Sequence, residues 1–173
     1  GPYTLTIQPL LTATLTGSSS AGLITINGAD NVIIDGSVGY TTNSICPPVT
    51  ASRDLTIINT NTGTSSAVVW LQTAAGDGAT NNVIRNCNIS GNAGNTTLVG
   101  IGSGSSAIAT NSLGTGNNNN RFENNNIKAV QIGIYSQGAS AANKNTGNII
   151  NQNVMNFPTG SSQNINTAGI FTG

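Results

Sequence analysis

The feature that most constrains the fold is a six-residue pattern that recurs along the chain. An apolar residue, any residue, Asn, any residue, Asn and a second apolar residue follow one another at 84–89, 122–127 and 149–154. The segments 33–38 and 57–62 fit more loosely, with Asp and Ser in the Asn places of the first and Thr closing the second. Five copies in one register predict a repeat fold, in which each copy belongs to one structural unit stacked on the next.

The spacing of the copies identifies the unit as one coil of a β-solenoid. Successive copies begin 24, 27, 38 and 27 residues apart, and the long step contains a segment rich in Gly, Ser and Asn at 102–120. This range fits one coil with an occasional loop insertion. The 173 residues therefore predict about seven coils at roughly 25 residues each. The first residues of the copies are expected to form a column inside the core: Ile33, Ile57, Ile84, Phe122 and Ile149.

Short β-rich segments predict at least two strands in every coil. One series contains the runs 23–26 and 32–34, and a second contains 100–103, 133–136 and 169–172. Turns rich in Asn, Gly and Ser separate them, and no segment has the 3.6-residue periodicity of an amphipathic helix. The sequence thus predicts an all-β fold, a right-handed parallel β-helix with loop insertions and little or no helix. We expect a single domain over 1–173 that is open at both ends.

Asparagine recurs at the turn that follows each core residue. Asn tolerates left-handed backbone conformations, and its amide can bond to the same residue one coil away. We therefore predict a stacked asparagine ladder, although the alternative that Asn merely marks solvated turns stays open at this point. The ladder residues are Asn59, Asn86, Asn124 and Asn151.

Composition excludes several classes of function. Charged residues are 6% of the chain, the net charge is zero, and the five basic residues are scattered, so no stripe can neutralise a nucleic-acid backbone. No apolar run is long enough to insert into a membrane. His is absent, and Cys46 and Cys87 are too few for a disulfide scaffold or a metal cage. One disulfide or two free thiols both remain open for this pair.

The repeats also resemble a known superfamily. The phrasing N-x-x-I-x-N-x-x-I and the segment 31–37, Asn-Val-Ile-Ile-Asp-Gly-Ser, resemble parallel β-helix repeats of the pectin-lyase-like superfamily. More narrowly, the segments 23–37, 54–63 and 81–92 are similar to repeat regions of very large secreted bacterial surface proteins, many exported by a Bacteroidetes-type route. The resemblance implies an extracellular or cell-surface location.

Enzymes of that superfamily are implied to need groups that this chain lacks. Its hydrolases are implied to use clustered Asp residues with a His and an Arg-Lys pair, and its lyases a carboxylate-bound calcium with a basic residue. Only Asp30 and Asp35 lie close together among the acidic residues, which makes them a weak calcium candidate. We expect no enzymatic activity, no catalytic residue, no metal and no cofactor. Arg85 and Glu123 occupy one repeat position in successive copies and are predicted to form a surface ion pair.

Three aromatic residues come from equivalent strand regions of different coils: Trp70, Tyr135 and Phe171. An exposed row of rings could stack on sugars, so Trp70 and Tyr135 are possible glycan contacts, while inward packing of the same rings is the alternative.

The function predicted from these features is structural. We expect an extracellular rigid solenoid, either a stalk segment or a subunit that self-associates end to end into filaments. The first strand, around Leu5 and Ile7, would then pair with the final coil of the next copy, around Ile170 and Phe171. A polysaccharide-binding module and a partial polysaccharide lyase are the alternatives.

Overall fold

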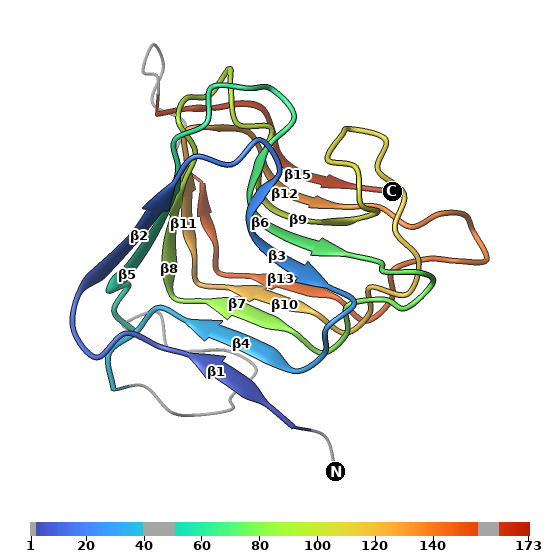
Figure 1. The fold of residues 1–173 in the computed structure, drawn as a ribbon, viewed down its shortest axis with the longest axis horizontal. Helices are drawn as coiled ribbons and strands as arrows, with labels where there is room; N and C mark the ends of the chain where they lie inside the picture. The colour runs from blue at the N-terminus through green and yellow to red at the C-terminus, as the bar shows by residue number, and fades with distance from the viewer. Residues whose placement is uncertain (1–2, 40–50, 156–162) are drawn as a thin grey trace.

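The architecture is a stack of parallel coils. The computed structural model describes residues 3–39, 51–155 and 163–173, and within them it contains fifteen strands and no helix. Each coil adds one strand to each of three sheets, and all pairing within the sheets is parallel (Figure 1). The predicted all-β parallel β-helix is confirmed.

Three five-stranded sheets form the walls of the solenoid. Sheet A contains β1 (Leu5–Ile7), β4 (Val32–Asp35), β7 (Val83–Arg85), β10 (Arg121–Glu123) and β13 (Ile149–Asn151). Sheet B contains β2 (Ala13–Gly17), β5 (Leu55–Asn59), β8 (Cys87–Ser90), β11 (Asn126–Lys128) and β14 (Val154–Met155). Sheet C contains β3 (Gly22–Asn27), β6 (Ala67–Gln72), β9 (Val99–Gly104), β12 (Val130–Ser136) and β15 (Ile165–Thr172).

The described strands make five coils, not the seven expected. The expectation treated Ile33 and Ile57 as anchors of successive coils, whereas β4 and β5 are two sides of the same coil. A coil with three strands and three turns is longer than roughly 25 residues. Two coils carry long excursions as well, one between β4 and β5 and one between β9 and β10.

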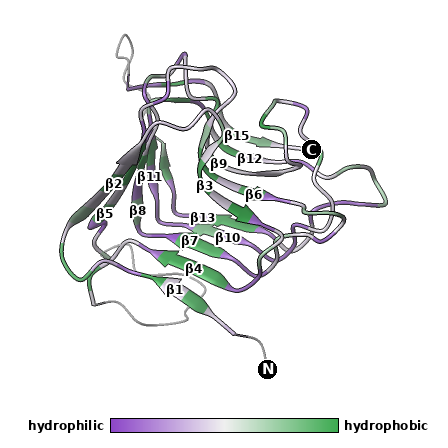
Figure 2. Ribbon diagram, viewed as in Figure 1, coloured by the Kyte–Doolittle hydropathy of each residue, from purple (hydrophilic) through white to green (hydrophobic). Residues whose placement is uncertain are grey.

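The core consists of three columns of apolar side chains, one from each sheet. Their interior members are at most 1% exposed, and apolar residues concentrate in the strands while the turns are hydrophilic (Figure 2). Complete burial of one such side chain contributes about 1.5–3 kcal/mol. The register of the strands gives column A as Ile7, Ile34, Ile84, Phe122 and Ile150. Column B is Leu15, Ile57, Ile89, Ile127 and Met155. Column C is Ile24, Val69, Ile101, Ile134 and Ile170.

Two of the predicted core residues are displaced by one position. Ile33 and Ile149 pair with Val83 and Arg121 and are only partly buried, while the residues after them, Ile34 and Ile150, belong to column A. Both positions are double isoleucines, so the sequence does not distinguish the two phases. A slip of one residue turns a strand side chain to the other face. Ile84 and Phe122 do pair and are fully buried, as predicted.

Left-handed residues turn the chain at the corners. Between sheets C and A the residues Asn31, Asn81 and Asn119 have φ of 57°, 57° and 56°. Between sheets A and B the corresponding values are 55°, 50° and 55° at Asn86, Asn124 and Gln152. Asparagine adopts this conformation more readily than most residues, which explains why it recurs once per coil at each corner.

Candidate functional site: the corners, the covered flank and the end faces

A ladder of side-chain amides stands at the corner between sheets A and B. Asn124 Nδ2 donates to Asn86 Oδ1, and Asn86 Nδ2 donates to Asp35 Oδ1, each at 2.8 Å. The Arg53 guanidinium donates to Asn124 Oδ1 at 2.6 Å and to the Asn124 carbonyl at 2.7 Å. A guanidinium can only donate and a carboxylate can only accept. The two charged residues therefore fix the direction in which every amide of this ladder points.

The predicted ladder is correct for two of its four members. Asn86 and Asn124 stack, but Asn59 ends β5 in sheet B, where its amide bonds to Ser19 and Ala67. Asn151 pairs with Glu123 in sheet A. Asn59 was misplaced because Ile57 belongs to another sheet, and Asn151 because of the one-residue ambiguity at the double isoleucine.

A second arrangement of asparagines bonds each coil to the coil before it. Asn120 is typical: its Oδ1 accepts the backbone N–H of Asn82 and its Nδ2 donates to the carbonyl of Ala79, both at 2.9 Å. One side chain thus holds two backbone groups of the preceding coil. We call these residues clamp asparagines. They are Asn82, Asn117, Asn120, Asn125, Asn145, Asn148 and Asn153.

Sequence reasoning missed the clamps, although a signal for them exists. Asn82, Asn120 and Asn148 each stand two residues before a column A residue and directly after a left-handed corner residue. Asn125 and Asn153 each directly follow the left-handed residue of the next corner. The pattern was interpreted as one ladder, whereas the corners hold several.

The charged residues of sheet A are paired and buried. Arg85 Nε lies 2.8 Å from Asp35 Oδ2, and Arg121 lies 2.7 Å from Glu123. Arg85 and Glu123 are 4% and 0% exposed, so their prediction as a surface ion pair is wrong. Removing one partner of a buried pair typically costs about 3–5 kcal/mol, because the other charge is left without compensation. These residues stabilise the wall of the solenoid.

The aromatic residues form a stacked column on the outer flank of sheet C. The ring centroids of Trp70 and Tyr135 are 5.8 Å apart, and those of Tyr135 and Phe171 are 5.4 Å apart. Trp70 Nε1 donates to the Ser105 carbonyl at 2.8 Å, and the Tyr135 hydroxyl lies 2.9 Å from the Ser112 carbonyl. Both contacts come from the excursion between β9 and β10, which covers the rings.

Burial of these rings overturns the predicted glycan contacts. Trp70 and Tyr135 are 1% and 0% exposed, so neither ring offers a face to a sugar. Burial also raises the pKa of the Tyr135 phenol, with an opposing effect from the hydrogen bond with Ser112. Phe171, at the C-terminal end of the column, is 36% exposed.

The remaining polar residues offer structural roles. Asp30 accepts hydrogen bonds from Thr80, and hydrogen bonds from Ser52 and from the Val38 amide lower the pKa of Asp54. Burial raises the pKa of the Cys87 thiol far above its usual range, so Cys87 is protonated and free. Its predicted partner in the alternative disulfide, Cys46, lies outside the described residues. In the described parts of the chain no group of three or more His, Cys, Asp or Glu could hold a metal.

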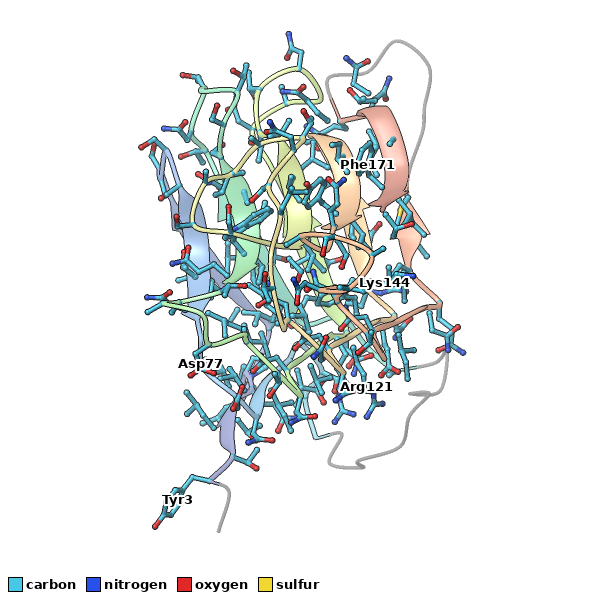
Figure 3. All side chains as sticks on the ribbon, turned by 90° about the vertical axis from the view of Figure 1, so that its right-hand side faces the viewer. Tyr3, Asp77, Arg121, Lys144 and Phe171 are labelled. Carbon is cyan, nitrogen blue, oxygen red and sulfur yellow. The ribbon has the colours of Figure 1, made fainter. Side chains whose placement is uncertain are left out.

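The two end faces expose the ends of the core columns. At the N-terminal face Ile7 and Leu15 are 44% and 46% exposed, and at the C-terminal face Ile170 is 51% exposed. A hollow of about 340 Å³ at the C-terminal face is lined by one residue of each column, Ile150, Met155 and Ile170, together with Asn151, Gln152 and Asn153. The coils between these faces lie side by side in Figure 3, with Tyr3 at one end and Phe171 at the other.

The topology corrects the predicted pairing between copies. Leu5 and Ile7 lie on β1, an edge of sheet A, whereas Ile170 and Phe171 lie on β15, an edge of sheet C. A coil that continued the three sheets would place β1 beside β13 and β3 beside β15. Ile7 would then meet Ile150, and Ile24 would meet Ile170.

No protein-family model, curated protein or solved structure matches this chain. No helix in the described residues is long and apolar enough to cross a membrane.

Proposed function

We propose that this chain is an extracellular structural protein, a rigid β-solenoid segment of a stalk or filament that lengthens when further coils stack on its open faces. The observation that carries the proposal is the continuity of the three core columns. Each column runs through all five coils and reaches both faces, where its last members are exposed. An added coil would bury them and pair both edge strands.

The bonding between coils supports a load-bearing role. Adjacent coils are joined along three sheets, by the clamp asparagines and by buried ion pairs. Strands of neighbouring coils lie about 4.8 Å apart, so the body lengthens by that amount for each coil. Because the net charge is zero, long-range repulsion between stacked copies is weak.

The extracellular location rests on the sequence. Its repeats resemble those of the pectin-lyase-like superfamily and of very large secreted bacterial surface proteins, and its surface is rich in neutral amides and hydroxyls. A stalk segment on a cell surface fits that resemblance. The aromatic residues that suggested glycan binding are covered, so we do not extend the proposal to a polysaccharide ligand.

Sedimentation velocity tests the proposed stacking. We expect the purified chain to form species that grow with concentration. Ile170→Lys should suppress this growth, because Ile170 is 51% exposed at the C-terminal face and a lysine there would put a charge into the apolar seam.

Leu113→Lys is the matched control, since Leu113 is 43% exposed on the flanking excursion, away from both faces. Growth that persists in Ile170→Lys, or a wild-type chain that stays monomeric at every concentration, would overturn stacking between copies.

A further inference from the structure

The clamp asparagines show which kind of coil the C-terminal face accepts, if coils add there as proposed above. Every clamp Oδ1 accepts an N–H from the preceding coil. In one series Asn82 accepts from Val32, Asn120 from Asn82, and Asn148 from Asn120, at 2.9, 2.9 and 2.8 Å. The bonds are therefore directional: each coil supplies the side chains that hold the coil before it.

Two further series run in the same direction. Asn125 accepts from the N–H of Cys87 at 3.1 Å, and Asn153 accepts from the N–H of Asn125 at 3.0 Å. Asn117 accepts from the N–H of Ala79 at 2.9 Å, and Asn145 from the N–H of Asn117 at 3.2 Å.

All three series stop at the last coil. The backbone N–H groups of Asn145, Asn148 and Asn153 find no acceptor among residues 3–39, 51–155 and 163–173. These are the groups that a clamp asparagine would bind if the next coil carried one. An unsatisfied N–H that becomes buried costs about 1–3 kcal/mol, so a coil without these asparagines would cover the face at a penalty.

We infer that the C-terminal face is a template for a coil that carries asparagine at the three clamp positions. Its preferred partner is thus a parallel β-coil of the same type as the third to fifth coils of this chain. The apolar columns provide the area for stacking, and the three waiting N–H groups provide the selectivity.

The first coil of this chain does not meet that requirement. Leu5 pairs with Val32, which directly precedes the Ile33–Val83 pair, so Leu5 stands in the column of Asn82, Asn120 and Asn148. Ala13 pairs with Leu55 and, through Cys87, stands in the column of Asn125 and Asn153. A junction between two copies would therefore be held by strand pairing and apolar contact, without clamps at these two positions.

Grafting a sixth coil tests the inference. One extension after Gly173 repeats residues 145–173 and so supplies copies of Asn145, Asn148 and Asn153. The matched extension is identical except that these three copies carry Asn→Ala. The readout is native-state hydrogen exchange of the original Asn145, Asn148 and Asn153 amides, with the amides of β13 and β15 as reporters of whether the added coil orders.

We expect the asparagine extension to slow exchange of the three amides about tenfold relative to the alanine extension, the effect of one backbone hydrogen bond at each position. Equal protection by two ordered extensions would overturn the inference and leave the proposed function intact. If neither extension protects β13 and β15, coils do not add at this face, and the proposed function fails together with the inference.

Discussion

Asparagine occupies three kinds of position in this chain, and each uses a different property of the side chain. At the corners it adopts the left-handed backbone. In the ladder its amide donates to one neighbour and accepts from the other. In the clamps a single amide satisfies an N–H and a carbonyl of the preceding coil. The neutral amide can do all three within a wall that has few charges, because it both donates and accepts.

The ladder makes Asn86 the asparagine whose loss should be most costly. Asn86→Ala leaves the donor of Asn124 and one acceptor of Asp35 without a partner in a buried corner. We expect the free energy of unfolding to fall by about 1–3 kcal/mol more than in the control. The midpoint of urea denaturation measures the difference.

Asn81→Ala is the control, because Asn81 has φ of 57° against 55° for Asn86 and is exposed. Both variants place alanine in a left-handed conformation, so that cost cancels. Equal loss of stability in the two variants would show that the ladder adds nothing beyond the backbone preference.

At the scale of the element, the aromatic column depends on a glycine. Trp70, Gly102, Tyr135 and Phe171 are paired in successive strands of sheet C. A Cβ on Gly102 would lie 2.1 Å from Cζ3 of Trp70, so the indole can lie over β9 only because residue 102 has no side chain. The same ring is then covered by the excursion between β9 and β10.

Gly102→Ala should therefore displace Trp70 and loosen the covering excursion. We expect the variant to be less stable by about 1–3 kcal/mol, the usual cost of overpacking. Trp70 is the only tryptophan in the chain, so its fluorescence emission should move to longer wavelength as the ring becomes hydrated. Thermal unfolding followed by this fluorescence measures both effects.

Gly63→Ala is the comparison, because a Cβ there meets only the mobile end of the Asn61 side chain. An emission maximum in Gly102→Ala that equals that of the wild type would contradict the packing described for the flank.

The elements also show how far the sequence determines the structure. Strands β7 and β10 pair as predicted, because a single apolar residue before the Asn pattern, Ile84 or Phe122, fixes which face points inward. The double isoleucines at 33–34 and 149–150 leave that phase open, so both copies were placed one residue out of register. The cover over Trp70 depends on where a long excursion folds back, which no periodic pattern records.

At the scale of the whole molecule, three sheets per coil explain both the coil number and the character of the end faces. A two-strand coil predicted seven short coils, whereas a three-sided coil of greater length gives five. Three walls enclose a core of three columns, and each column ends exposed at both faces. Growth of such a body in one direction requires only that the next coil keep the register of all three sheets.

Electron microscopy of the purified protein over a range of concentrations tests this account most directly. We expect rods that lengthen as the concentration rises, with strands across the rod and a repeat of about 4.8 Å along its axis. Isolated particles of constant size at every concentration, or strands running along the rod, would contradict a solenoid that grows by stacking coils.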